Sequence, residues 1–392
     1  MNATGEASSR RLADMAAAAG LRRVHVLAWR DLDDPEAGGS ETHAHEIASR
    51  WAGAGLDVTM RTSFATGHPP TRTRSGYRVV RRAGRYMVFP RAALAEMSRL
   101  HGRRDGLVEI WNGMPFFSPL WCSGPRIVFL HHLHAEMWKL SVPPHLSLLG
   151  RLIESRLAPP MYRDTTLVTL SESSKHELVT EMGFRSERVR VVPPGVNERF
   201  SPGTDPKSER PMVLGVGRLV PVKRFELLID SLVELKRAVP AVEATIVGEG
   251  YERAMLEDRI RAAGADEWVQ LRGRVSDDDL VSLYRRAWVV ASTSLREGWG
   301  MTLTEAAACG TPAVATDIAG HRDAVLDDRS GLLVERVADL ARALERVLTD
   351  EPLRTRLSRG ALARAGDHTW DQAALGTLEA LAEDARARGE GR

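Results

Sequence analysis

The sequence has few cysteines, few aromatic residues and almost no excess of one charge. Two of its 392 residues are cysteines, which excludes a disulfide framework or a four-thiolate zinc site within one chain. Such scarcity is typical of a reducing cytoplasm. Lysine and arginine number 54 against 52 aspartate and glutamate, a net charge of +2. This balance argues against a dedicated nucleic-acid-binding protein, which usually carries a much stronger basic excess.

Long hydrophobic runs are also missing. No stretch approaches the ~18 uninterrupted apolar residues that a transmembrane helix needs. The first 20 residues hold a short alanine run, which is shorter and less hydrophobic than the core of a signal peptide. We therefore expect residues 1–20 to form a flexible or weakly helical leader. We also expect a cytoplasmic protein, at most peripheral to the inner face of a membrane.

The sequence does contain a repeated alternation of apolar strands and helical patterns. Runs such as residues 24–29, 107–111 and 126–131 are continuously apolar, as buried parallel strands are. Polar residues and then a helical pattern follow each run, which predicts α/β domains with doubly wound parallel sheets. The length fits two such domains.

A stretch rich in proline and glycine, residues 193–211, divides this alternation in two. We expect an N-terminal domain over residues 21–200, a second domain over 201–369 and a C-terminal helix over 370–392. Ligands of open α/β sheets bind beyond the carboxyl ends of the strands. Candidate site residues should therefore follow strands, in a cleft between the domains.

Glycines follow the first strand of the N-terminal domain. Gly38, Gly39 and Ser40 precede a helix, where backbone N–H groups can approach an anion. A turn with Ser40 as the helix N-cap explains the same residues.

Histidines follow the strand 126–131. Alternation along a strand places His132 and His134 on one face and His131 on the other. This spacing does not favour a compact zinc site, even with Glu136 nearby. A histidine in contact with the substrate and a hydrogen-bonded histidine at a buried strand end remain the alternatives.

Two cations follow the first strand of the second domain. Arg218 offers a planar fork and Lys223 a point charge, a combination that suits a diphosphate. Two solvated surface cations are the alternative. Gly215 and Gly217 do not complete a dinucleotide-binding fingerprint, because the third glycine would fall at Val220.

The strongest pattern is a pair of glutamates, Glu297 and Glu305, with seven residues between them. Glu297 can meet a sugar, and Glu305 can accept hydrogen bonds from a ribose diol. The backbone between them can face an anion, through Gly298, Gly300, Met301, Thr302 and Leu303. A capping box of Thr302 and Glu305 explains Glu305 but neither Glu297 nor the glycines.

These motifs together resemble the family 4 retaining glycosyltransferases, which have the GT-B fold of two Rossmann-like domains facing a central cleft. The resemblance covers nearly the whole chain, from AGGSETHAHEIASRW through FLHHLH, VVPPGVNERFSP and VGRLVPVKRFELLIDSL to EGWGMTLTEAAACGTPAVATD. The chain departs from the family at Arg224, where glycine is frequent, and at PPGVN, where PNGVD is usual.

The resemblance implies transfer of a sugar from a nucleotide-diphosphate sugar to a hydroxyl acceptor, with retention and with neither metal nor cofactor. Arg218 and Lys223 would hold the diphosphate, Glu305 the ribose, and Glu297 with the following amides the sugar and phosphates. The segment 272–275, with Gly273 and Val275, would meet the base.

In the first domain, Gly39 and Ser40 would close on the phosphate, and His131 would align with the family's strand-end histidine. The catalytic set implied is His131, Arg218, Lys223 and Glu297. The neighbouring His132 and His134 leave the histidine register open. The helix 370–392 would pack back on the first domain.

The acceptor, a glycan, a lipid or a small molecule, would bind mainly to the first domain. Residues 71–104 hold ten arginines and one acid, Glu96. They fit anionic lipid headgroups or a phosphorylated acceptor, or else a solvated, partly mobile loop. Asn112 and Trp138 are candidates for acceptor contact, with a core position as the alternative.

Other classes use the same cleft. A sugar phosphorylase, a nucleotide-sugar epimerase and a non-catalytic nucleotide-sugar-binding protein are the alternatives, and a zinc hydrolase would use the histidines. The complete cation and carboxylate sets favour the transferase.

Overall fold

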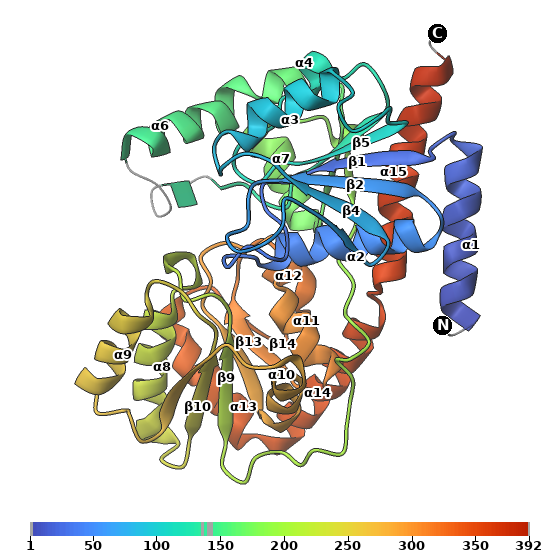
Figure 1. The fold of residues 1–392 in the computed structure, drawn as a ribbon. Coiled ribbons are helices and arrows are strands. Elements are labelled where there is room, and N and C mark those ends of the chain that lie inside the picture. The colour runs from blue at the N-terminus through green and yellow to red at the C-terminus, as the bar shows by residue number, and fades with distance from the viewer. Residues whose placement is uncertain (1–2, 135–136, 139–143, 391–392) are drawn as a thin grey trace. The chain divides into compact units, whose positions relative to one another are not determined.

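The computed structural model describes residues 3–134, 137–138 and 144–390, which divide into two compact α/β units (Figure 1). Unit 1 comprises Met1–Gly195 and Trp370–Arg392, and unit 2 comprises Val196–Thr369. The chain thus enters unit 2 a few residues earlier than expected, and the C-terminal segment groups with the first unit.

Unit 1 is built on an eight-stranded sheet of order β3-β4-β2-β1-β5-β6-β7-β8. Every strand pair is parallel except β3–β4, which is antiparallel. The strands are β1 (Arg23–Leu27), β2 (Asp57–Thr62), β3 (Thr71–Arg74), β4 (Tyr77–Arg81), β5 (Gly106–Ile110), β6 (Arg126–Phe129), β7 (Thr166–Thr169) and β8 (Val189–Val191). Strands β1 and β6 each end two residues before the predicted apolar runs end, which leaves His131 in the loop after β6.

Helices cover both faces of this sheet. They are α1 (Ala3–Ala18), α2 (Gly39–Gly53), α3 (Val88–Met97), α4 (Ser118–Trp121), α6 (Pro144–Leu152), α7 (Glu172–Met182) and α15 (Trp370–Glu390), with the short turns η1 (Ile153–Leu157), η2 (Pro159–Tyr162) and η3 (Ser186–Arg188). Successive strand residues alternate between the faces: Leu27 packs towards α3, and its neighbour Val26 lies beneath α2.

The leader, expected to be flexible or weakly helical, forms helix α1. Leu12 and Ala16 lie one turn apart and are both buried. Helix α1 contacts α15 and α2, so these residues add a layer to unit 1. The alanine run is therefore part of a packed amphipathic helix.

The arginine-rich segment is also ordered, contrary to the mobile-loop alternative. Its first part forms the β3–β4 hairpin and pairs with the acidic loop after β1. Arg74 and Arg81 form ion pairs with both Asp31 and Asp33, and Arg72 pairs with Asp33. Arg81 is fully buried and the Arg74 side chain is 12% exposed, so these two cations act within the fold.

Unit 2 is built on a six-stranded, fully parallel sheet of order β11-β10-β9-β12-β13-β14. The strands are β9 (Met212–Val216), β10 (Glu243–Val247), β11 (Val269–Gly273), β12 (Val289–Ser292), β13 (Ala313–Thr316) and β14 (Gly331–Val334). The helices and turns are η4 (Pro221–Lys223), α8 (Phe225–Ala238), α9 (Arg253–Ala262), α10 (Asp277–Arg286), α11 (Met301–Ala308), α12 (His321–Ala324), η5 (Val337–Asp339), α13 (Leu340–Thr349) and α14 (Glu351–Gly366). None of the described helices is both long and apolar enough to cross a membrane.

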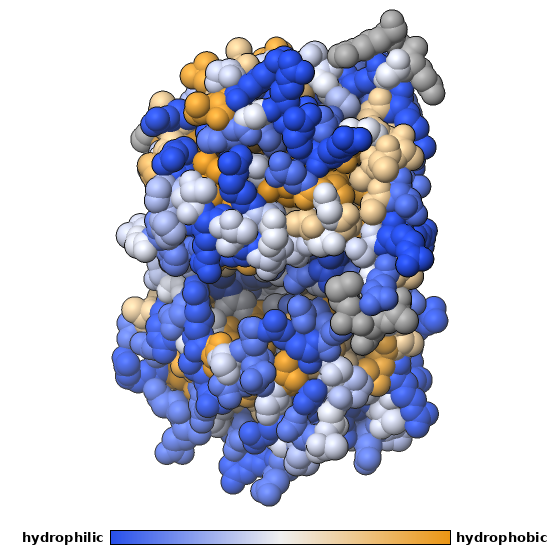
Figure 2. Space-filling view, turned by 45° about the vertical axis from the view of Figure 1, so that its right-hand side comes forward, coloured by the Kyte–Doolittle hydropathy of each residue, from blue (hydrophilic) through white to orange (hydrophobic). Residues whose placement is uncertain are grey.

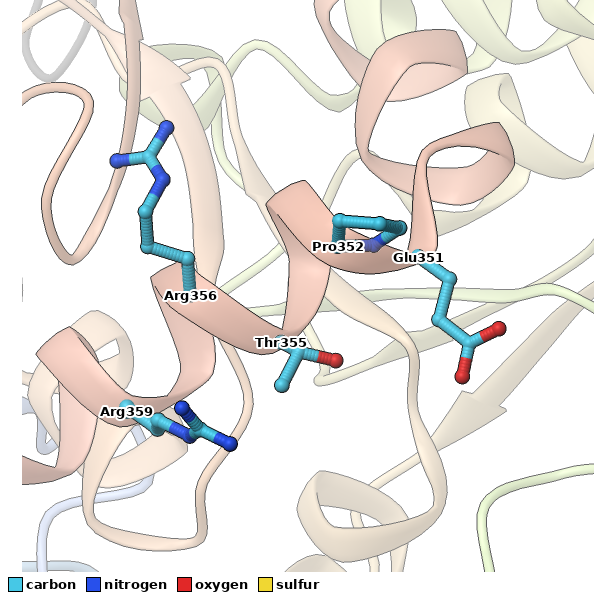
Figure 3. Close-up of a pocket in the computed structure, with 5 residues that line it drawn as sticks. All are labelled: Glu351, Pro352, Thr355, Arg356 and Arg359. Carbon is cyan, nitrogen blue, oxygen red and sulfur yellow. The ribbon is translucent and has the colours of Figure 1, made fainter.

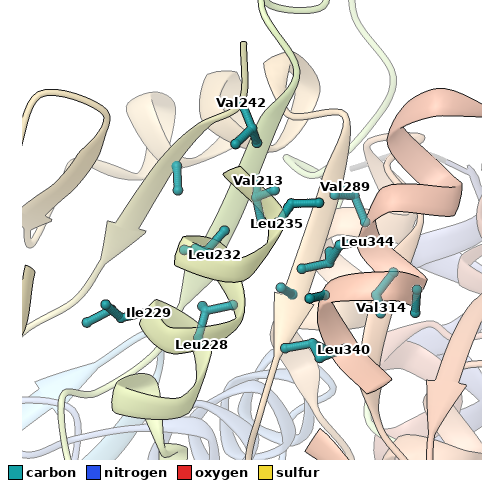
Figure 4. Close-up of a cluster of buried hydrophobic side chains, with 14 of the residues drawn as sticks. Val213, Leu228, Ile229, Leu232, Leu235, Val242, Val289, Val314, Leu340 and Leu344 are labelled. Carbon is teal, nitrogen blue, oxygen red and sulfur yellow. The ribbon is translucent and has the colours of Figure 1, made fainter. Parts of the chain in front are cut away.

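The core of unit 2 packs α8 against the sheet and α13 (Figure 4). Leu228, Leu232 and Leu235 recur at helical spacing and are at most 1% exposed.

We expect Leu232→Ala to lower the free energy of unfolding by about 2–5 kcal/mol, because the cavity adds to the lost transfer free energy. Urea unfolding measures this, with Glu234→Ala on the exposed side of the same helix as the control. A loss as small as the control's would contradict this packing.

Candidate functional site

The carboxyl ends of the unit 2 strands gather the predicted residues of the second domain along one edge of the sheet. Gly273 ends β11, Arg218 and Lys223 follow β9, and Glu297 follows β12. Strands β11, β10, β9 and β12 are consecutive neighbours, so these residues lie in sequence along this edge. Parallel strand ends in open α/β sheets are where ligands bind.

Lys223 and Glu297 form an ion pair at this edge. The Lys223 ammonium donates to Glu297 Oε1, and the Ser294 hydroxyl donates to the same oxygen at 2.9 Å. Each side chain of the ion pair is 18% exposed. Burial raises the pKa of Glu297, but the Lys223 charge, His321 and the two hydrogen bonds outweigh it, so the pKa lies below its ordinary value. The site therefore presents an ionised carboxylate beside a cation.

His321, which sequence reasoning missed, lies beside this pair. Its Nδ1–H donates to the Thr316 carbonyl at 2.8 Å, which assigns the tautomer. Its Nε2 lies 3.4 Å from Ser292 Oγ, which is in turn 3.3 Å from Ser294 Oγ. Burial lowers the pKa of His321. Because His321 follows β13, the rule that site residues follow parallel strands offered a signal for it.

The loop between Glu297 and α11 is tightly packed. Gly300 has φ +96°, and a Cβ there would lie 3.0 Å from the His321 ring. A Cβ on Gly320 would lie 2.7 Å from the Glu297 carbonyl oxygen. Of the three amides expected to face an anion, the Leu303 N–H donates to the Gly300 carbonyl at 2.9 Å. The Leu303 N–H is therefore already hydrogen-bonded in the first turn of α11. The anion contacts of the Met301 and Thr302 amides remain predictions.

Glu305 does not cap α11, so the capping-box interpretation is wrong. The N-cap is Gly300, which has no side chain to accept a hydrogen bond. Glu305 Oε2 instead accepts from the Tyr284 hydroxyl at 2.9 Å. Burial raises the pKa of Glu305 to about 7, although the Tyr284 hydrogen bond opposes this shift. Tyr284 was missed because its contact with Glu305 is tertiary.

The raised pKa of Glu305 predicts a pH-dependent stability. Between about pH 4.5 and 7 the folded state keeps a proton that the unfolded state has released, so stability falls as pH rises. Relative to wild type, Glu305→Gln should therefore gain stability across this window, with no further gain above it. Urea unfolding at several pH values measures the difference. A difference independent of pH would contradict the shift.

The remaining predicted donor residues lie near the same edge. Arg218 is partly buried directly after β9. Gly273 has φ +70°, and a Cβ there would lie 2.6 Å from Glu249 Oε1. Val275 follows in the loop before α10 and is partly buried. The contacts expected of Gly273 and Val275 with a base remain predictions.

In unit 1, the glycine loop starts α2 differently from the expectation. The helix begins at Gly39 with Gly38 as N-cap, and Ser40 lies inside it, so Ser40 is not the cap. The Glu41 carboxylate accepts from the Gly38 N–H at 2.8 Å and pairs with Arg30. Asn112 Nδ2 donates to Ser40 Oγ at 3.4 Å, so the structure brings these two candidates together.

His131 is a buried histidine paired with a second one, His43, which sequence reasoning missed. His131 Nε2 and His43 Nδ1 are 3.3 Å apart. Burial lowers the pKa of His131 to about 4, so its ring is neutral at pH 7. His131 Nδ1 is buried with no hydrogen-bond partner among the described residues. His43 Nε2 is likewise buried without a hydrogen-bond partner among the described residues, so each ring of the pair keeps one unpartnered nitrogen.

His132 and His134 lie together, as predicted, but in the loop after β6 and not along a strand. Their rings stack at 4.9 Å, while His131 pairs with His43. In the described part of the chain, histidine, cysteine and acidic side chains form no group of three suited to a metal ion. Glu136 lies outside the described residues.

Trp138 is wedged against the backbone of unit 1. A Cβ on Gly150 would lie 2.6 Å from its ring. Its indole N–H donates to Glu154 Oε2 at 2.8 Å, and Glu154 Oε1 accepts the His134 backbone N–H at 3.0 Å. These contacts favour the structural alternative for Trp138, that of fixing α6 in place.

A shallow surface pocket lies along α14, apart from the candidate set (Figure 3). Its lining residues are all exposed and include none of the residues described above; they are Glu351, Pro352, Thr355, Arg356 and Arg359. Arg356 is tied to Asp328 by an ion pair. The pocket contains none of the residues at the carboxyl ends of the strands.

Comparisons with known proteins show the family of the chain. A family model described as Glycosyl transferases group 1 matches residues 196–364, and one described as Glycosyltransferase Family 4 matches residues 37–200. A D-inositol 3-phosphate glycosyltransferase of Acidothermus cellulolyticus is 30% identical over 418 residues, covering 92% of this chain and 91% of that relative. The chain belongs to glycosyltransferase family 4. It is a glycosyltransferase that acts on sugar donors.

Solved structures show the fold of this family 4 glycosyltransferase. Sucrose-phosphate synthase from Thermosynechococcus elongatus superposes with a TM-score of 0.78 at 20% identity, covering 91% of this chain and 98% of that one. Anabaena HepE, solved in complex with UDP and glucose, gives a TM-score of 0.70 at 18% identity, with 92% and 98% covered. The fold is GT-B, with two parallel-sheet α/β domains, as the sequence predicted.

Proposed function

We propose that this chain transfers a sugar from a nucleotide-diphosphate sugar to a hydroxyl acceptor, with retention and without a metal ion. The observation that carries the proposal is the Lys223–Glu297 pair at the carboxyl ends of β9 and β12, with Arg218 directly after β9. A family 4 transferase must stabilise a leaving group of high negative charge, and these cations supply the opposite charge without a metal.

In the proposed reaction, the bond between the sugar's anomeric carbon and the diphosphate oxygen breaks. The acceptor hydroxyl attacks from the same face, and its proton passes to the departing phosphate. Lys223 and Arg218 stabilise the charge that grows on the diphosphate oxygens. Lys223 pairs with Glu297, which holds the Lys223 ammonium in place at low solvent exposure.

The carboxylates bind the two ends of the donor in this proposal. Glu297 accepts hydrogen bonds from the sugar, and Glu305 accepts them from the ribose diol. Tyr284 holds Glu305 by its 2.9 Å hydrogen bond. At the edge strand of the same sheet, Gly273 and Val275 meet the base.

Unit 1 supplies the remaining contacts. Gly39 and Ser40 bind phosphate, and neutral His131 forms a hydrogen bond with the substrate through its unpartnered Nδ1. Asn112, which donates to Ser40, is the candidate for acceptor contact. The curated relative acts, by its name, on D-inositol 3-phosphate, which makes an inositol phosphate the first acceptor to test.

The proposal also locates the protein in the cytoplasm, with a peripheral membrane contact through the arginine-rich segment 71–104. Arg82, Arg91, Arg99 and Arg103 of this segment are exposed. The arginines that pair with Asp31 and Asp33 do not contribute.

The experiment that tests the donor assignment is thermal unfolding with UDP, GDP, ADP and dTDP, each with and without a sugar. A nucleotide at 100 times its dissociation constant should add about 2.7 kcal/mol of stability. We expect one nucleotide to stabilise the protein selectively, with the shift unchanged by a chelator. The absence of a shift with all four would overturn the donor assignment. NMR of the product from a stabilising donor then tests retention at the anomeric carbon.

A further inference from the structure

The helical stretch from α6 to η2 in unit 1 is amphipathic in the reverse sense. Its inward residues are small or acidic and recur at helical spacing: Ser147, Gly150, Glu154 and Ala158. Its large apolar residues point outward instead; they are Leu148, Leu149, Leu152, Leu157 and Met161, of which Leu148 is 71% exposed. A helix of a soluble domain normally buries its leucines and exposes its charges.

Buried contacts lock this orientation. Gly150 allows the Trp138 ring to lie against the α6 backbone, and Glu154 accepts hydrogen bonds from the Trp138 indole and the His134 backbone. Rotating the helix to bury Leu148 would expose Glu154 and break both bonds. The outward leucines therefore follow from the packing of the unit.

Helix α3 shows the same reversal. It buries Val88 in its first turn, but beyond that turn it buries Ala92, Ala95 and Glu96 and exposes Leu94 and Met97. Glu96 is held inside by His25 and Arg104. Tyr86, Met87 and Leu100, at the two ends of α3, are exposed as well.

The two reversed faces are connected through α4. This short helix contacts both α3 and η2, and its Leu120 is 66% exposed. Figure 2 shows orange hydrophobic residues interspersed with blue hydrophilic ones on the surface of unit 1. The outward apolar residues of α3, α4 and α6–η2 are called here the apolar–basic face, together with their exposed arginines: Arg82, Arg91, Arg99, Arg103, Arg151, Arg156 and Arg163.

This face carries far more positive than negative charge. Residues 82–104 and 146–163 contain only two acids, Glu96 and Glu154, and both are buried. Asp164, which follows Arg163, is exposed and pairs with Arg185 outside the face. Exposed leucines beside unopposed arginines suit a surface that is anionic at the headgroups and apolar beneath them. A protein partner would need acidic residues opposite these arginines. A second copy that packed through the same face would instead bring arginines against arginines.

We propose that the apolar–basic face docks on an anionic lipid bilayer, with the leucines of α6–η2 inserted at the headgroup boundary. This goes beyond the contact proposed for residues 71–104, because it places the inserting residues on α6–η2. In the docked state, most arginines of the apolar–basic face lie near lipid phosphates, and the leucines pass from water into the lipid.

The test is co-sedimentation of the full chain with phosphatidylcholine vesicles, with and without phosphatidylglycerol. We expect binding to the anionic vesicles, weakened by salt. Leu148→Ser with Leu152→Ser should lower the partition constant at least tenfold, because two exposed leucines no longer leave water. Arg151→Gln with Arg156→Gln should lower it about thirtyfold, roughly fivefold for each cation removed.

The matched controls are exposed residues of unit 2. Tyr251→Ser with Met255→Ser removes apolar area of similar exposure, and Arg342→Gln with Arg346→Gln removes two exposed cations. Both controls should bind vesicles like wild type. Thermal unfolding confirms that every variant folds, since the changed side chains are exposed.

Two outcomes would overturn the proposal. One is the absence of binding to anionic vesicles, or binding that the Leu148/Leu152 variant leaves unchanged. The other is sedimentation velocity showing a dimer of wild type that this variant abolishes, which would make a second copy the occupant. Because vesicle binding is measured without a sugar donor, its result is independent of the transferase proposal.

Discussion

Lys223→Ala should lower kcat about a thousandfold, in line with the loss of one group that stabilises developing negative charge. In the proposed reaction no metal ion shares the charge of the leaving diphosphate, so the loss of Lys223 leaves Arg218 alone of the two proposed cations to stabilise that charge. The same change should weaken binding of the nucleoside diphosphate, since Lys223 meets the same oxygens in the complex. Steady-state kinetics and nucleotide titration measure the two effects.

The Lys223–Glu297 pair complicates this experiment, because removing the ammonium leaves the Glu297 carboxylate without its cation. Lys223→Arg keeps the charge and should recover part of the rate. Arg210→Ala is the matched control: Arg210 pairs with Glu243 at the opposite, amino ends of β9 and β10. Its loss should leave turnover unchanged. Wild-type turnover and nucleotide binding in Lys223→Ala would remove Lys223 from the proposed site.

The strand-end residues were predictable because parallel topology alone puts them on one edge. Once the apolar runs were interpreted as parallel strands, Arg218, Lys223 and Glu297 had to lie at the same edge of the sheet; that β9 and β12 are neighbours came from the structure. The rule needs no knowledge of side-chain contacts. The same rule applies to His321, which follows β13. A single histidine shows no spacing pattern in the sequence, so it was missed.

The helix starts were harder to predict, because backbone conformation decided them. Ser40 and Thr302 have the side chains that favour helix caps. The structure caps both helices with glycines instead: Gly38 in α2, whose N–H bonds to Glu41, and Gly300 in α11 at φ +96°. Because Gly300 is the cap of α11, the Glu305 side chain is not used for capping. It accepts the hydrogen bond from Tyr284 instead.

The arginine-rich segment could not be predicted from its own composition. Ten arginines with a single acid suggest a solvated surface as long as only that segment is considered. The partners of Arg74 and Arg81 are Asp31 and Asp33, about forty to fifty residues earlier in the chain. Only the pairing of β4 with β2, next to β1, brings the acidic loop to them.

His131→Ala should lower the transfer rate about a hundredfold, within the range that one well-placed hydrogen-bonding group contributes to catalysis. The reason is the unpartnered Nδ1 of a neutral, buried ring, which the proposal assigns to the substrate. Because the pKa of His131 is about 4, this residue should add no titration to the rate between pH 6 and 8. The pH profile of kcat/KM tests that part directly.

Substituting His131 also removes the partner of His43, so a loss of rate must be separated from a loss of stability. Leaving a buried polar group without its partner costs about 1–3 kcal/mol. Rates should therefore be measured well below the unfolding temperature of the variant.

His43→Ala breaks the same 3.3 Å contact from the other side. If the contact matters only for packing, the two variants should lose the same activity. A much larger loss in His131→Ala assigns the role to His131 itself. Normal turnover in His131→Ala, with a loss in His132→Ala or His134→Ala, would instead move the functional histidine to the stacked pair.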